Sequence, residues 1–228
     1  MRDMNIQVEK ARYIFKHLVH VGAPFPVRDV MQHLLSKGYR YTIRKIKVGG
    51  PTPQTSPVPA DFPHAKELTE YLFFRQDLPN LLIVVSENGF VVDGQEWGDV
   101  YDHIWFVRDL YLKIEKRPTT KFIIEILAFL QVYSSVSPRR ILSGIVNPAI
   151  LKRMQSLELL PFAIDLWTGE PEKSKTWARV RLEPLKEDPQ NRFSVNINYR
   201  AHSFNEGVKF FEQINDFVSR LIVNLRPE

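Results

Sequence analysis

The sequence predicts an α+β protein with an N-terminal α/β part, a helical middle and a C-terminal antiparallel β-β-β-α unit. Two neighbouring stretches carry this prediction. Residues 193–200 alternate apolar side chains at odd positions with polar ones at even positions, which is the period of a half-buried strand. Residues 204–225 repeat apolar side chains every three or four positions, which indicates a helix with one buried face, and Ser203 with Glu206 fits a capping box at its start. We therefore expect this helix to pack on the apolar face of the strand before it.

Residues 1–47 are predicted to form a basic helix-helix-strand segment. The apolar spacing favours a helix over 6–21 and a shorter one over 27–35, each followed by glycine. The stretch 39–48 is interpreted as a strand, because tyrosine and β-branched residues favour extended backbone. The same outline also fits a helix-turn-helix, with Tyr39–Lys47 in the position that reads DNA.

Residues 48–63 are predicted to be a proline-rich linker, since five prolines between positions 51 and 63 hold the chain extended. Residues 64–118 then form an acidic α/β segment. In it we expect a helix over 65–74, a β-hairpin over 81–92 that turns at Asn88-Gly89, and a helix over 99–114.

Residues 119–160 are predicted to be helical. The stretch 122–133 is apolar on nearly every side, which is typical of a core helix. Pro138 and Pro148 each follow a capping residue, and a proline after a cap commonly opens a helix. Residues 161–228 complete the chain as a three-strand meander and the long helix. The five segments are expected to pack as one or two domains.

Charge is unevenly distributed along the chain, although the net charge is only +5. Residues 1–47 hold ten Lys and Arg against three Asp and Glu, whereas residues 61–118 hold six against eleven. A basic segment beside an acidic one indicates either a polyanionic partner or two regions that attract each other.

Several classes of protein are excluded or disfavoured by composition. The absence of cysteine excludes disulfides and thiolate metal sites. The sequence has no apolar run long enough to span a membrane and no apolar signal segment, so a cytoplasmic location is expected. Phosphate-loop, dinucleotide and serine-hydrolase glycine motifs are all missing. No cofactor is therefore expected.

The polar face of the meander is the first candidate contact surface. It comprises Asp165, Trp167, Trp177, Arg179, Arg181, Asn196, Asn198 and Arg200. Tryptophan and arginine suit stacking on bases and pairing with phosphates. They are also the residues most often decisive in protein–protein interfaces. A third interpretation covers this face with another helix, such as 122–133, and makes the tryptophans part of the core.

A second candidate surface combines basic and aromatic residues: Tyr39, Arg40, Tyr41, Arg44, Lys45 and Lys47. It suits nucleic acid by neutralising phosphates. Alternatively it is a solvated edge strand whose charges prevent edge-to-edge pairing.

An acidic stretch offers the remaining candidate chemistry, with Asp93, Glu96, Asp99, Asp102 and His103 close in sequence. Carboxylates near a histidine suit a hard divalent ion, although the spacing matches no known loop. Taken together, the first hypothesis is a non-enzymatic binding or assembly subunit with protein partners inside a larger complex. The second is a nucleic-acid-binding protein, and the third a divalent-metal hydrolase or nuclease.

Overall fold

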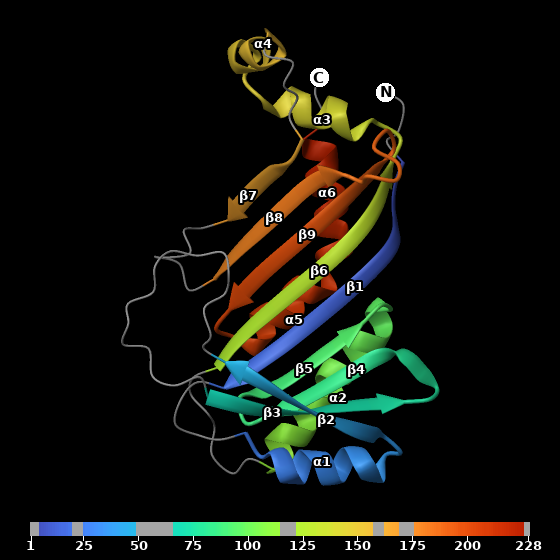
Figure 1. Cartoon of the computed structure of the whole chain (residues 1–228), viewed down its shortest axis with the longest axis vertical. Helices are drawn as coiled ribbons and strands as arrows, with labels where there is room; N and C mark the ends of the chain where they lie inside the picture. Colours follow the sequence, from blue (N-terminus) through green and yellow to red (C-terminus); the bar gives the residue numbers. More distant parts are fainter. Residues whose placement is uncertain are drawn as a thin grey trace.

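A single antiparallel sheet of nine strands organises the described part of the chain. The computed structural model describes residues 5–19, 25–48, 66–114, 122–156, 162–168 and 176–225. The strands are β1 (Ile6–Val19), β2 (Arg40–Val48), β3 (Lys66–Arg75), β4 (Leu78–Ser86), β5 (Gly89–Gly94), β6 (Phe122–Ser134), β7 (Ile164–Thr168), β8 (Trp177–Pro184) and β9 (Arg192–Ala201). They lie in the order β2-β3-β4-β5-β1-β6-β9-β8-β7 (Figure 1).

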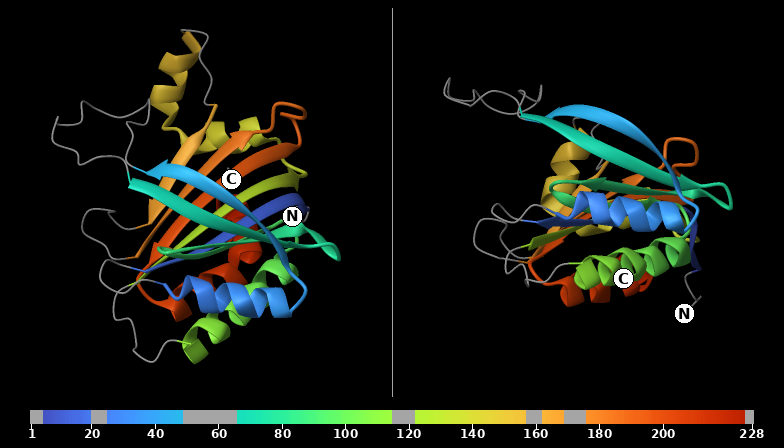
Figure 2. Two further views of the ribbon diagram at one scale, coloured as in Figure 1. Left: turned by 60° about the horizontal axis from the view of Figure 1, so that its bottom comes forward. Right: turned by 90° about the horizontal axis from the view of Figure 1, so that it is seen from below.

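Helices cover one face of this sheet. They are α1 (Val27–Ser36), α2 (Trp97–Ile114), α3 (Pro138–Ile145), α4 (Pro148–Ser156), α5 (Phe204–Glu212) and α6 (Ile214–Asn224). Helices α2, α5 and α6 lie behind the sheet in Figure 1, and α1 lies at the bottom of that view. The right view of Figure 2 shows α1 between the strands and α2. Helices α3 and α4 lie at one end of the sheet. We call the side opposite the helix layer the open face.

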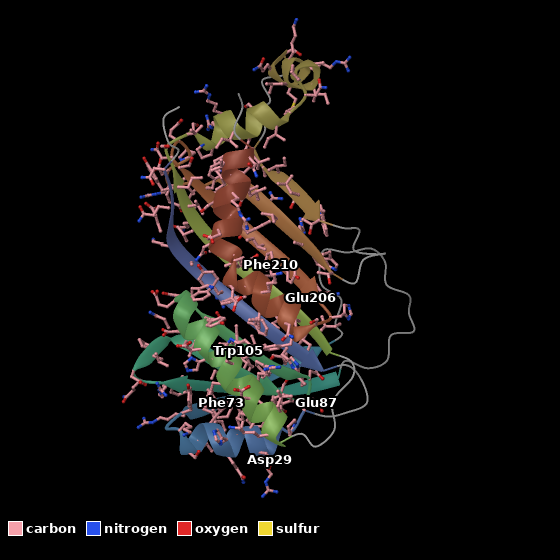
Figure 3. All side chains as sticks on the ribbon, turned by 180° about the vertical axis from the view of Figure 1, so that it is seen from behind. Asp29, Phe73, Glu87, Trp105, Glu206 and Phe210 are labelled. Carbon is pink, nitrogen blue, oxygen red and sulfur yellow. The ribbon has the colours of Figure 1, made fainter. Side chains whose placement is uncertain are left out.

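The core lies between the sheet and the helix layer. Phe15 of β1 makes edge-on contacts with Phe204 and Phe211 of α5, at ring-centroid distances of 5.7 and 6.2 Å. Trp105 of α2, labelled in Figure 3, packs edge-on against Phe204 of α5 at a ring-centroid distance of 5.4 Å, so α2 and α5 are in contact. Burial of each such aromatic side chain stabilises the fold by about 1.5–3 kcal/mol.

The order of elements repeats about the central pair of strands. The first half runs β1, α1, β2 to β5, α2, and the second runs β6, α3 and α4, β7 to β9, α5 and α6. Strands β1 and β6 pair antiparallel along their whole lengths, at the centre of the sheet. Each half then places its last strand, β5 or β9, on the outer side of its first. The sequence itself has no detectable repeat.

The predicted layout is wrong as a whole, because the N-terminal segment, the middle and the C-terminal unit contribute strands to one sheet. Three stretches predicted as helices are strands over their described residues: the stretch 6–21 contains β1, 65–74 contains most of β3 and 122–133 lies in β6. In β6, Ile124 and Ile126 are buried under the helices, while Leu127 and Phe129 lie on the open face. A strand apolar on both faces has a nearly continuous hydrophobic sequence, which resembles that of a buried helix.

Other predicted elements are confirmed. β7, β8 and β9 form an antiparallel meander, and Gly89 makes the turn between β4 and β5 with a positive φ of 128°. Ser203 caps α5, where its hydroxyl accepts the N–H of Glu206.

The long C-terminal helix, in contrast, is interrupted at Gln213, which separates α5 from α6. The proline-rich segment falls outside the described residues, apart from its first residue. Among the described helices, none has the length and apolar content needed to cross a membrane.

Candidate functional site

The first candidate surface lies on the open face, where the structure brings all of its residues together. Pairing of β8 with β9 places Trp177 beside Arg200, Arg179 beside Asn198 and Arg181 beside Asn196. Pairing of β7 with β8 places Asp165 and Trp167 of β7 beside Arg181 and Arg179. The alternative in which a helix over 122–133 covers this face is wrong, because that stretch is β6, a neighbour in the same sheet. Within the described residues, no helix lies over these side chains (Figure 1).

Two tryptophans form the aromatic part of this surface. The rings of Trp167 and Trp177 lie 5.7 Å apart and are tilted by 39°. The guanidinium of Arg179 lies 5.3 Å above the ring of Trp167, which is 49% exposed, and that of Arg200 lies 5.5 Å from Trp177. These distances fit cation–π contacts, in which each tryptophan ring lies against the guanidinium group of one arginine.

Carboxylates neutralise the arginines of this surface. Asp165 on β7 accepts from Arg179 at 2.9 Å and from Arg181 at 3.1 Å, and Arg181 also donates to Glu183. The hydrogen bond from Arg179 is the main reason why the pKa of Asp165 lies below its usual range. The carboxylate therefore remains charged in mild acid.

Glu125 of β6 joins the meander to β1 and was not among the candidate residues. Its carboxylate accepts from Lys16 at 2.7 Å and from Arg200 at 3.2 Å, and its side chain is only 14% exposed. Burial alone raises the pKa of Glu125, but Lys16 and Arg200 outweigh it and leave the pKa lowered. Sequence reasoning missed this triad because Lys16 and Glu125 were both assigned to helices.

The amides of this surface lie between the charged residues. Asn196 and Asn198 on β9 are half-buried, with β6 on one side and β8 on the other. The side-chain oxygen of Asn198 is buried and has no hydrogen-bond partner within the described residues. We call Trp167, Trp177, Arg179, Arg181, Asn198 and Arg200 the Trp/Arg surface.

The second candidate surface is divided, because alternate residues of a strand face opposite sides. Tyr39 is buried under the helices, where its hydroxyl lies 2.6 Å from Nε2 of His103. Burial raises the pKa of Tyr39. Arg44, in contrast, lies on the other side of β2 and pairs with Glu70 of β3. The side chain of Lys47 is outside the described part, so the strand interpretation of this stretch is confirmed but a single basic-aromatic surface is not.

The acidic stretch is also divided between the two sides of the sheet. Asp93 lies on the open face and pairs with Arg12 at 2.7 Å. His103 lies on the helix side, between the hydroxyl of Tyr39 and the carbonyl of Asp99, whose oxygen is 2.6 Å from its Nδ1. Over the described ranges, no three His, Asp or Glu side chains converge as metal ligands do.

Comparisons with known proteins give no family and no fold relative. No family model, no curated protein and no solved structure matches this chain.

Proposed function

We propose that this protein is a non-enzymatic binding or assembly subunit that docks a protein partner on the Trp/Arg surface. The observation that carries the proposal is the composition and openness of that surface. It combines exposed tryptophan and paired arginines on one side of a large sheet.

The charge balance favours protein over nucleic acid as the partner. Each of the three arginines has a carboxylate within 3.2 Å, so a phosphate has to displace an existing ion pair. A protein partner can leave those pairs intact and bury the tryptophan rings between them. Tryptophan and arginine are enriched at the centres of such interfaces, where single truncations weaken binding most.

A partner pull-down with matched variants tests this proposal. Tagged wild-type protein and a Trp177→Ala variant are incubated with an extract of the producing cells, and the retained proteins are identified. We expect at least one protein whose retention falls roughly tenfold or more without Trp177. Leu112→Ala is the control, because Leu112 is an exposed apolar residue of α2, on the helix side. Retention that is equal in all three proteins contradicts the proposal.

A nucleic-acid partner is the second candidate, and the two adjacent tryptophan rings are the observation that favours it. Stacking of single-stranded bases on such rings is sequence-tolerant and salt-sensitive. Titration of the intrinsic fluorescence with mixed-sequence single and double strands, at low and high salt, tests it. Quenching that needs Trp177 and weakens with salt supports nucleic acid, and its absence at low salt removes this candidate.

A further inference from the structure

One stretch of β1 lacks a neighbouring strand on its outer side. Strand β1 pairs with β6 from Ile6 to Val19, with a register shift between Val8 and Lys10, but it pairs with β5 only from Tyr13 to Leu18. The backbone groups of Ile6–Arg12 that point away from β6 therefore have no strand partner among the described residues. Seven extended residues make a free edge about 23 Å long. Figure 1 shows this part of β1 at the margin of the sheet, beyond the end of β5.

The end of β5 has a local cause. The chain turns at Gly94 into α2, and Val100 donates its N–H to the carbonyl of Glu96 in the first turn. Gly94 is packed so closely that a Cβ there would lie 2.6 Å from a methyl group of Val100. Strand β5 is thus drawn under the sheet at this point and does not continue along β1.

The second half of the molecule shows the same position filled. Strand β9 is the counterpart of β5, and it pairs with β6 over ten residues, from Ile124 to Tyr133. The counterpart of the free edge is therefore paired on both sides. In the first half, by contrast, β5 ends early and leaves Ile6–Arg12 of β1 without the neighbouring strand that β9 provides for β6.

A hollow of about 620 Å³ lies beside the free edge. Its lining includes residues 8–13, Trp97, Phe129 and Asn215. Trp97 is half-buried and is held in place because its indole N–H donates to the carbonyl of Phe211 at 3.0 Å. Two of the charged side chains on this edge are engaged elsewhere, since Arg12 pairs with Asp93 and Glu9 with Arg192, whereas Lys10 is exposed.

We infer that the free edge of β1, Ile6–Arg12, accepts an extended segment of a partner protein as a tenth strand. Main-chain hydrogen bonds supply the affinity in this mode of binding, and alternate side chains supply the specificity. The occupant is a stretch of six or seven residues without an internal proline, because proline removes a donor. One of its apolar side chains meets Trp97 in the hollow. The site is separate from the Trp/Arg surface and does not depend on the function proposed for it.

Hydrogen exchange of the free full-length protein is the first part of the test. The register of β1 against β6 shifts between Val8 and Lys10, so we expect fast and slow amides to alternate separately over Ile6–Val8 and over Lys10–Arg12. Within each stretch, alternate N–H groups point to β6 and to the free side. Slow exchange at every position would show that the edge is already covered and would overturn the inference. Slow exchange that appears only at high protein concentration would assign the edge to a second copy, which overturns it as well.

A peptide probe is the second part. A library of random linear dodecapeptides is selected on the protein, and the binders are synthesised and tested by hydrogen exchange. We expect peptides that protect the fast amides of Ile6–Arg12 and that bind the Trp177→Ala variant equally well. Failure to recover such peptides, or protection only at β2 or β7, the outer edges of the sheet, overturns the inference.

Two proline variants separate edge binding from stability. Lys10 and Ala11 are adjacent, so the N–H of one points to β6 and that of the other to the free side. Lys10→Pro and Ala11→Pro should therefore differ, with one variant less stable and the other as stable as wild type. The stable variant should bind the selected peptides roughly tenfold more weakly, because one main-chain hydrogen bond is lost. Unchanged binding by the stable variant contradicts the inference.

Discussion

His17 illustrates how strongly a single buried residue links this fold to pH. It lies on the helix side of β1, only 4% exposed, and its ring stacks on Phe90 at 5.1 Å. Burial, helped by the nearby charge of Arg108, lowers the pKa of His17 from 6.5 to about 4. The neutral imidazole is thus part of the core.

We predict that His17 makes the protein sensitive to acid. Above pH 6.5 the imidazole is neutral in both the folded and the unfolded chain, so its contribution to stability is constant. Between pH 6.5 and about 4 only the unfolded chain binds the proton, so the free energy of unfolding falls, by on the order of 3 kcal/mol. Urea unfolding across this range should show the loss in wild type and in His202→Gln, whose imidazole is exposed, but not in His17→Leu. An unchanged pH profile in His17→Leu would contradict this assignment.

Glu125 is the second residue with a large expected effect. In Glu125→Gln, Lys16 and Arg200 lose the carboxylate that both of them contact. Because this site is largely shielded from water, we expect a loss of about 1–3 kcal/mol in the free energy of unfolding. Asp77→Asn is the control, since the carboxylate of Asp77 pairs with Arg75 in an exposed position and should matter less. Equal effects of the two substitutions would show that Glu125 is no more important than a surface ion pair.

Individual elements show which sequence signals sufficed and which did not. The Asn88-Gly89 turn, the Ser203 cap and the alternation from Phe193 to Tyr199 were predictable, because each depends on local backbone chemistry. The central strands β1 and β6 were not. Leu127 and Phe129 face away from the helices but are still apolar, so the alternation that distinguishes a strand from a buried helix is weak. Only the pairing between distant segments resolves that ambiguity.

At the level of elements we predict that the β4–β5 turn tolerates no side chain at Gly89. A Cβ there would lie 2.0 Å from the carbonyl oxygen of His17, and the positive φ of 128° adds strain. Gly89→Ala should therefore lower the free energy of unfolding by about 3 kcal/mol or more. Gly38→Ala is the matched control, because Gly38 has a positive φ but open space around it, and it should cost only about 1 kcal/mol. Similar losses in both variants would contradict a steric cause at Gly89.

In the described part of the molecule, all strands belong to one sheet, and the two topological halves meet at β1 and β6. A continuous core beneath that sheet leads us to predict a single unfolding transition. Tryptophan fluorescence and far-ultraviolet circular dichroism should report the same midpoint in urea. Two separated midpoints would indicate that the halves unfold independently.

At this scale the candidate site was predicted in part. The residues of the meander were grouped correctly, because period-two alternation places them on one side of the sheet. The neutralisation of Arg200 was not foreseen, since its partner Glu125 comes from a strand that was predicted as a helix. The grouping of Tyr39 with Arg44 failed for the opposite reason, as the same alternation separates these two residues.

The measurement that tests the central claim most directly is site-specific photo-cross-linking in the producing cells. A photoreactive amino acid replaces Trp167 on the open face or, in a second variant, Leu112 on the helix side. We predict that a defined protein is cross-linked to the variant with the photoreactive residue at position 167 and not to the variant with it at position 112. Cross-linking of nucleic acid from position 167, or of the same proteins from both positions, would contradict a protein-docking role for the open face.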